Sequence, residues 1–95
     1  MASLNIVEGF EQQRFIPLDR AVMVIGRDPA CDISVPVVSM SRRHTRIVRI
    51  DDQFYIEDLD TLGGTWVNRQ RIKGRTVLHD GDWIMLAGMR AVFRS

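Results

Sequence analysis

The sequence predicts an all-β fold in which two sheets pack face to face as a sandwich. Short runs rich in Val, Ile and aromatic residues recur along the chain, and polar or Gly/Pro turns separate them. Apolar residues within these runs recur with a period of about two, which is typical of strands, and not of about 3.6, which is typical of helices. Turn signals at 28–29, 51–52, 68–70 and 80–82 have the spacing expected of a sandwich.

Each expected strand is one of these runs. We expect strands over 4–7, 14–16, 21–25 and 45–50 in the first half of the chain, and over 53–57, 82–86 and 89–94 in the second. The last run shows the alternation best, because Met89, Ala91 and Phe93 lie on one face, which we expect in the core. Residues 90, 92 and 94 are expected to face the other way.

Length and charge narrow the classes of function. Ninety-five residues are expected to form one domain, 1–95, too short for separate cofactor and substrate domains. The charges of the 13 basic and 12 acidic residues nearly cancel, which gives no reason to expect a nucleic-acid or membrane partner.

The single cysteine, Cys31, cannot form an internal disulfide, and no segment resembles a signal peptide, so we expect a cytoplasmic setting. We expect no cofactor and no metal, because His79 has no partner histidine or cysteine.

Arg27 is the first candidate binding residue. It follows the apolar run 21–25 through Gly26, so we expect it where a strand ends and a loop begins. A guanidinium there can bind a phosphate through two parallel hydrogen bonds, a geometry that lysine lacks. The alternative is an ion pair with Asp28 or Asp32, which contributes at most about 1 kcal/mol when exposed.

The segment Ser41-Arg42-Arg43-His44 offers a hydroxyl donor and two further positive charges. A turn here would also direct backbone N–H groups at an anion. A catalytic Ser41–His44 pair is disfavoured, because neither an orienting acid nor a Gly-x-Ser-x-Gly motif accompanies it. We therefore expect binding and not catalysis.

The order and spacing of these segments, followed by Thr-Leu-Gly-Gly-Thr at 61–65 and Val-Asn at 67–68, resemble the forkhead-associated (FHA) domain from about 22 to 93. The resemblance implies a sandwich of about eleven short strands, in antiparallel or mixed sheets, that docks phosphothreonine peptides on loops at one end. It implies that Arg27 and Ser41 bind the phosphate, with Arg42 beside it. It also implies that five residues support the loops, with His44 buried: Gly26, His44, Thr61, Gly64 and Thr65.

Two positions depart from the family pattern, which most often reads Ser-x-Asn-Gly-Thr. In the family, the asparagine bonds the peptide backbone, and the residue before it often donates a hydroxyl to the phosphate. Here Gly63 stands in place of the asparagine, and Leu62 stands in place of the residue before it. Neither side chain can make those bonds, which implies a weaker or altered site, and the paired glycines imply a flexible loop. Asn68 resembles a family residue whose amide bridges the loop to the peptide or to another loop, with an ordinary turn residue as the alternative.

A basic row is expected along one side of an irregular hairpin, formed by Arg69, Arg71, Lys73 and Arg75. Near the peptide loops it would favour acidic residues flanking the phosphate; far from them it could contact nucleic acid, although no aromatic residues alternate with it.

We expect a signalling module that recognises phosphothreonine in a partner protein. Its expected peptide-binding residues are Arg27, Ser41, Arg42, Leu62, Gly63 and Asn68. The alternative is a degenerate FHA scaffold that associates with a protein, or with itself, without phosphate; Leu62 and Gly63 favour it, whereas Arg27 and Ser41 oppose it.

Overall fold

The computed structural model describes residues 1–8 and 14–95, and within these ranges the chain forms strands and no helix. The strands confirm the predicted all-β class and the expected number of about eleven. They are β1 (Ser3–Glu8), β2 (Arg14–Pro17), β3 (Val22–Gly26), β4 (Ile33–Ser34), β5 (Thr45–Ile50), β6 (Gln53–Asp58), β7 (Trp66–Val67), β8 (Gln70–Arg71), β9 (Thr76–Leu78), β10 (Trp83–Leu86) and β11 (Met89–Arg94).

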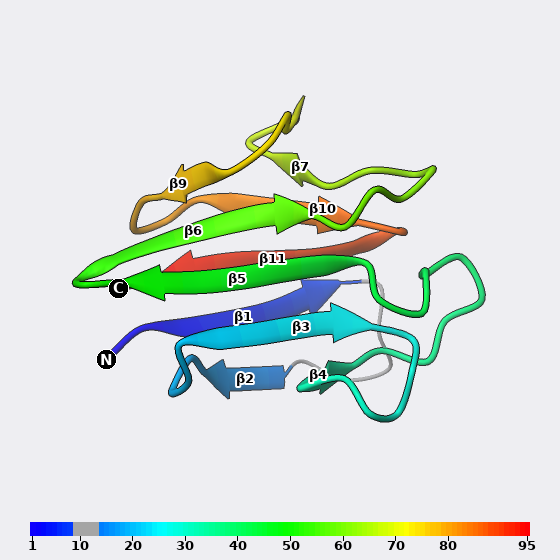
Figure 1. Ribbon diagram of the computed structural model, residues 1–95, viewed down its shortest axis with the longest axis horizontal. Helices are drawn as coiled ribbons and strands as arrows, with labels where there is room; N and C mark the ends of the chain where they lie inside the picture. The colour runs from blue at the N-terminus through cyan, green and yellow to red at the C-terminus, as the bar shows by residue number, and fades with distance from the viewer. Residues whose placement is uncertain (9–13) are drawn as a thin grey trace.

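Two sheets form the sandwich, as the sequence predicts. One has six strands in the order β2-β1-β11-β10-β7-β8, and the other has five in the order β4-β3-β5-β6-β9. Among the described residues, all neighbouring strands run antiparallel except β3 and β4, which run parallel. Figure 1 shows β3, β5 and β6 in front of β1, β10 and β11, so the hydrophobic interior lies between these two layers.

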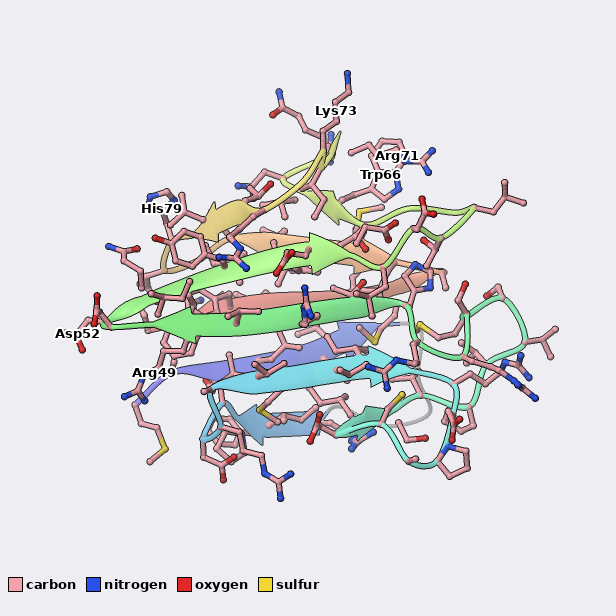
Figure 2. All side chains as sticks on the ribbon, viewed as in Figure 1. Arg49, Asp52, Trp66, Arg71, Lys73 and His79 are labelled. Atoms are coloured by element: carbon pink, nitrogen blue, oxygen red, sulfur yellow. The ribbon has the colours of Figure 1, made fainter. Side chains whose placement is uncertain are left out.

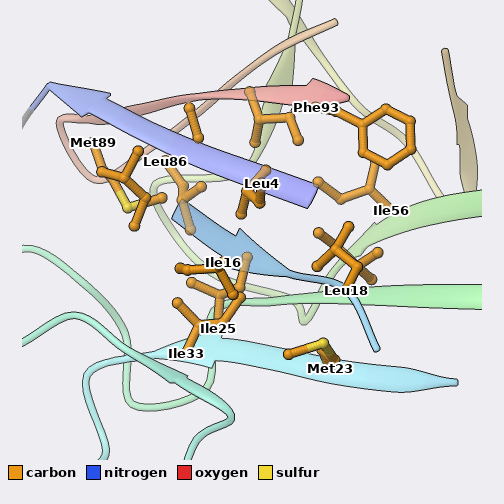
Figure 3. Close-up of a cluster of buried hydrophobic side chains, with 14 of the residues drawn as sticks. Leu4, Ile16, Leu18, Met23, Ile25, Ile33, Ile56, Leu86, Met89 and Phe93 are labelled. Atoms are coloured by element: carbon orange, nitrogen blue, oxygen red, sulfur yellow. The ribbon is translucent and has the colours of Figure 1, made fainter. Parts of the chain in front are cut away.

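The core consists of the inward side chains of both sheets (Figure 3). Met89, Ala91 and Phe93 are buried in it, as the alternation in β11 predicts. Val92 lies outside this cluster, as expected, but is nevertheless only 7% exposed. It stands directly across from Trp83 in β10 and Asn5 in β1, and such cross-strand neighbours shield a small side chain on an outer sheet face.

The strands that the sequence did not identify individually are short. β4, β7 and β8 have two residues each and β9 has three, which is too few to show an alternation. Turns are present between strands at 51–52, 68–69 and 80–81, within the predicted 51–52, 68–70 and 80–82, and the turn predicted at 28–29 lies at 29–30. Four of their residues have positive φ, namely Asp51, Asn68, Arg69 and Gly81.

Three loops meet at one end of the sandwich, on the right in Figure 1. They are the β3–β4 loop (27–32), the β4–β5 loop (35–44) and the β6–β7 loop (59–65). The β10–β11 turn reaches the same end, where Ser39 Oγ donates to the Ala87 carbonyl over 3.1 Å. The sheet directions therefore bring together the three segments that carry the family motifs.

Candidate functional site

Backbone hydrogen bonds join the β3–β4 loop to the β4–β5 loop. The Arg27 N–H donates to the Ser41 carbonyl over 2.9 Å, and the Asp28 N–H donates to the Arg42 carbonyl over 3.1 Å. Gly26 permits this approach, because a Cβ there would collide with the Arg42 carbonyl and lie 2.9 Å from Cys31 Sγ. The structure thus brings Arg27, Ser41 and Arg42 side by side from two loops.

The Arg27 side chain is exposed, and its Nε donates to the Met40 carbonyl over 3.1 Å. Asp28 and Asp32, the alternative ion-pair partners of Arg27, both bind other groups. Asp28 accepts the Ala30 N–H, and Asp32 accepts the Val24 N–H and pairs with Arg20 over 3.1 Å. Since Met40 is buried, this bond anchors the guanidinium at its stem.

A cavity of about 240 Å³ lies beside this guanidinium, lined by Arg27, Asp28, Pro29 and Arg42. Two of its four lining residues are arginines, and neither forms an ion pair within the described part of the chain. Such a cavity is electrostatically suited to an anion.

His44 connects the β4–β5 loop to the β6–β7 loop. It is 1% exposed, and its Nδ1 accepts the Ser41 N–H over 3.2 Å. Because Nδ1 is an acceptor, the ring hydrogen is on Nε2, which donates to the Gly64 carbonyl over 2.9 Å. The imidazole therefore fixes the position of Ser41 relative to the second loop. The Ser41 side chain itself is half-buried.

Asp58, at the end of β6, organises the start of the β6–β7 loop. It accepts hydrogen bonds from the Thr61 N–H (2.8 Å), the Thr61 hydroxyl (2.7 Å) and the Thr65 hydroxyl (2.7 Å). Burial alone would raise the pKa of Asp58, but these bonds and the nearby His44 outweigh it and hold the pKa below its ordinary value. Thr61 Oγ1 also accepts the Gly64 N–H over 3.0 Å.

All four carbonyl oxygens of residues 61–64 accept hydrogen bonds from side chains. Arg71 Nη2 donates to the carbonyls of Thr61 (3.4 Å) and Leu62 (3.1 Å), and Trp66 Nε1 donates to that of Gly63 (3.3 Å). The fourth carbonyl, that of Gly64, is the one that binds His44. The paired glycines were expected to make this loop flexible, but the loop is extensively hydrogen-bonded because β7 and β8 supply donors that its own sequence lacks.

The two departing residues lie on the outside of this loop. The Leu62 side chain is 96% exposed, and an added Cβ at Gly63 would have no atom within 4 Å. Val38, on the β4–β5 loop, is 97% exposed. The same end of the sandwich therefore presents two apolar side chains to solvent in addition to its arginines.

Asn68 lies in the β7–β8 turn and not on the loop that binds His44. Its side-chain Nδ2 donates to Asp82 Oδ1 over 2.9 Å, and its side-chain Oδ1 accepts the Trp83 N–H over 3.0 Å. These bonds link the β7–β8 turn to the start of β10, which matches a loop-to-loop bridge. They do not connect Asn68 to Arg27 or Ser41.

Three of the four cations expected to share one side of a hairpin have different surroundings, and the fourth, Lys73, lines a cavity together with Arg71. Arg71 contacts the β6–β7 loop, and Arg75 pairs with Glu57 over 3.2 Å and lies over the Tyr55 ring. Arg69 lines a cavity of about 370 Å³ with Trp83 and Met85. The segment is too irregular for a fixed alternation, because residues 72–75 are not in a strand and Gly74 has a φ of 70°. The contacts of Arg71 and Trp66 with the loop were not foreseen from the sequence.

Within residues 1–8 and 14–95, no group of three or more His, Cys, Asp or Glu side chains could hold a metal ion. Those same residues include no helix of the length and hydropathy needed to span a bilayer.

Comparison with known proteins places this arrangement in a family. A family model described as FHA domain matches residues 23–87. The oxoglutarate dehydrogenase inhibitor of Corynebacterium jeikeium is 41% identical over 80 residues, which are 84% of this chain and 54% of that protein. The chain thus spans about half the length of relatives that it matches.

Two solved structures share the fold. The FHA domain of the CT664 protein from Chlamydia trachomatis superposes with a TM-score of 0.91 at 25% identity, covering 99% of this chain and 96% of that one. Mycobacterium tuberculosis EmbR, in complex with a low-affinity phosphopeptide, superposes with a TM-score of 0.87 at 29% identity, covering 97% of this chain and 24% of that one. The matched family model and the shared sandwich lead to one conclusion: this chain belongs to the FHA domain family.

Proposed function

We propose that the chain binds phosphothreonine in a partner protein, through the loops that join β3 to β4 and β4 to β5. The observation that carries the proposal is the hydrogen bond from the Arg27 N–H to the Ser41 carbonyl, because it holds the backbones of these two residues side by side. Support also comes from the 29% identical structure of EmbR, which is in complex with a phosphopeptide.

Charge-assisted hydrogen bonding is the proposed mechanism. Phosphothreonine carries a charge near −2 at neutral pH and three acceptor oxygens. Arg27 uses Nε on the Met40 carbonyl, so its two terminal nitrogens are left to bind two phosphate oxygens. The Ser41 hydroxyl donates to a third oxygen, and Arg42, which lines the same cavity as Arg27, adds positive charge.

His44 contributes by positioning. It holds the Ser41 backbone against the β6–β7 loop and is itself almost fully buried, so it does not contact the peptide. Thr61, Gly64 and Thr65 hold that loop in shape through Asp58. Gly63 lacks the side-chain amide that commonly bonds the peptide backbone. We therefore expect the affinity for a phosphopeptide to be about tenfold lower than that of a site with asparagine at this position, because one such hydrogen bond contributes about that much.

This function requires binding and no catalysis, and we place the module in a signalling role within a reducing, cytoplasmic compartment. The single cysteine, Cys31, supports that compartment, since one cysteine cannot form an internal disulfide. Specific observations favour a second candidate function, phosphate-independent association, because Leu62 and Val38 are almost completely exposed at the binding end.

The deciding experiment measures binding of a phosphothreonine peptide library to the wild-type chain and to Arg27→Ala. Arg49→Ala is the matched control, because Arg49 is also exposed but lies at the opposite end of the sandwich (Figure 2). We expect phosphate-dependent binders for the wild type and Arg49→Ala, and none for Arg27→Ala at an unchanged melting temperature. Equal binding by Arg27→Ala would contradict the proposal.

A further inference from the structure

Arg71 reaches the binding end from a different part of the fold than Arg27 and Ser41. It lies in β8, opposite Trp66 in β7, and both side chains turn toward the β6–β7 loop (Figure 2). The guanidinium packs onto Gly64 so closely that an added Cβ there would lie 2.8 Å from Arg71 Cζ. The loop and this arginine therefore have a fixed relative position.

Holding the loop uses only part of the guanidinium. Its two hydrogen bonds to the loop, to the carbonyls of Thr61 and Leu62, both come from Nη2. An arginine side chain has five N–H groups on three nitrogens, and within the described part of the chain Nη1 keeps both of its hydrogens for another acceptor. The residue is exposed, and the carbonyls of the loop are already occupied.

The arginines around this end have no ion-pair partner within the described part of the chain. Arg46 and Arg75, on the outer face of the five-stranded sheet, both pair with Glu57. Among residues 1–8 and 14–95, no ion pair involves the arginines at the binding end, which are Arg27, Arg42, Arg43 and Arg71. Of the two carboxylates nearest to Thr61, Asp58 is engaged by Thr61 and Thr65, and Asp60 is exposed on the loop itself.

We propose that Arg71 is a specificity-determining residue of this peptide site, which recognises an acidic side chain close to the phosphothreonine. Nη2 holds the loop at Thr61 and Leu62, and Nη1 donates to the carboxylate of the peptide. The inference rests on the proposed function and deepens it: the partner segment is a phosphothreonine flanked by Asp or Glu.

The test uses synthetic phosphothreonine peptides with a neutral background and a single Glu, moved through the positions on either side of the phosphothreonine. The wild-type chain should bind the peptide with Glu at its best position about tenfold more tightly than the matched peptide with Gln there. Calorimetry at two salt concentrations measures the ratio, which should shrink at the higher salt because the contact is exposed.

Arg71→Gln removes the charge and keeps a side-chain N–H donor, and an unchanged melting temperature would show that the loop is still held. The Glu-to-Gln ratio should fall close to one in this variant. Lys73→Gln is the matched control: it removes the same charge from an exposed residue of the same segment, for which no bond to the loop is seen. This control should keep the ratio.

The outcomes are distinct. Phosphate-dependent binding by the wild type without any preference for Glu would overturn the role of Arg71 and leave the proposed function standing. A preference that persists in Arg71→Gln, or that Lys73→Gln also removes, would likewise overturn it. If no phosphopeptide binds the wild type, both the proposed function and this inference fail.

Discussion

The imidazole of His44 donates its Nε2 hydrogen to the carbonyl of Gly64 over 2.9 Å, across 20 positions of the sequence. Its other nitrogen accepts the Ser41 N–H, so one buried ring sets the distance between a proposed phosphate ligand and the β6–β7 loop. Because neither nitrogen is free, a substitution here affects the fold and the site together.

We predict that His44→Ala lowers the free energy of unfolding by about 2–4 kcal/mol, because it leaves a cavity and unpaired polar groups. Phosphopeptide affinity should fall as well, since Ser41 loses its support. Urea denaturation and calorimetry measure the two effects. His79→Ala is the control, because its side chain is 73% exposed, and it should change stability by less than about 0.5 kcal/mol. Equal stability of the two variants would contradict the prediction.

Gly26 and Gly63 should differ sharply in their tolerance of alanine. Gly26→Ala forces a Cβ against the Arg42 carbonyl and Cys31, so it should destabilise the fold by about 1–3 kcal/mol and separate Arg27 from Ser41. Gly63→Ala adds a methyl group with no atom within 4 Å, so its effect should stay within about 0.5 kcal/mol. Thermal melts of both variants test this, and similar melting temperatures would disprove the close approach at Gly26.

Stability should decrease at acidic pH in part because of Asp58. Burial opposes its ionisation, but the bonds from Thr61 and Thr65 hold its pKa below the ordinary value, so the folded state binds fewer protons than the unfolded state. The stabilisation is therefore complete well above pH ~4 and is lost as the pH falls below it. Glu57, whose pKa is lowered by Arg46 and Arg75 against the effect of burial, contributes with the same sign.

Asp58→Asn should be less stable than the wild type at pH ~7, with a smaller difference at pH ~3. Denaturant titrations across this range measure the gap between the two proteins. A gap that stays constant with pH would mean that the ionised carboxylate contributes nothing beyond its shape.

The double substitution Leu62→Thr and Gly63→Asn distinguishes the two candidate functions. Both positions are exposed and Gly63 has free space around it, so the fold should tolerate the change. If the site binds phosphopeptide, the added hydroxyl and amide should raise the affinity about tenfold. If exposed Leu62 anchors a phosphate-independent partner, the same variant should lose that partner, because a buried leucine contributes roughly 1.5–3 kcal/mol.

Calorimetry with a selected phosphopeptide and co-purification of partners before and after phosphatase treatment measure these opposite outcomes. Unchanged affinity together with unchanged partners would leave 61–65 as a purely structural loop.

Phosphoserine should bind more weakly than phosphothreonine, because the missing methyl group removes roughly 0.8 kcal/mol of burial. Binding of either should strengthen between pH ~5 and ~7, as the second proton leaves the phosphate near pH ~6. Fluorescence titrations with matched peptides test both statements. Identical affinities for the two phosphopeptides would show that no part of the site contacts the methyl group.

The sequence by itself determined the fold class and the alternation in β11. The residues that the FHA resemblance assigns to the phosphate were also chosen from the sequence, and they stay a prediction. These are encoded locally: Met89, Ala91 and Phe93 alternate within one strand, and Gly26-Arg27 stands at the end of an apolar run. Their order along the chain also indicated the family, which the match over residues 23–87 confirms.

Only the tertiary structure decided how the β6–β7 loop is held. Its sequence, with two glycines, suggests a flexible segment, but its carbonyls are bonded by Arg71, Trp66 and His44, which come from other elements. The separation of Arg71 from Arg69 and Arg75 likewise depends on strand pairing and on the irregular residues 72–75. Hydrogen bonds between residues distant in sequence have no local pattern, and so the arrangement of sheets, not the spacing of residues, sets them.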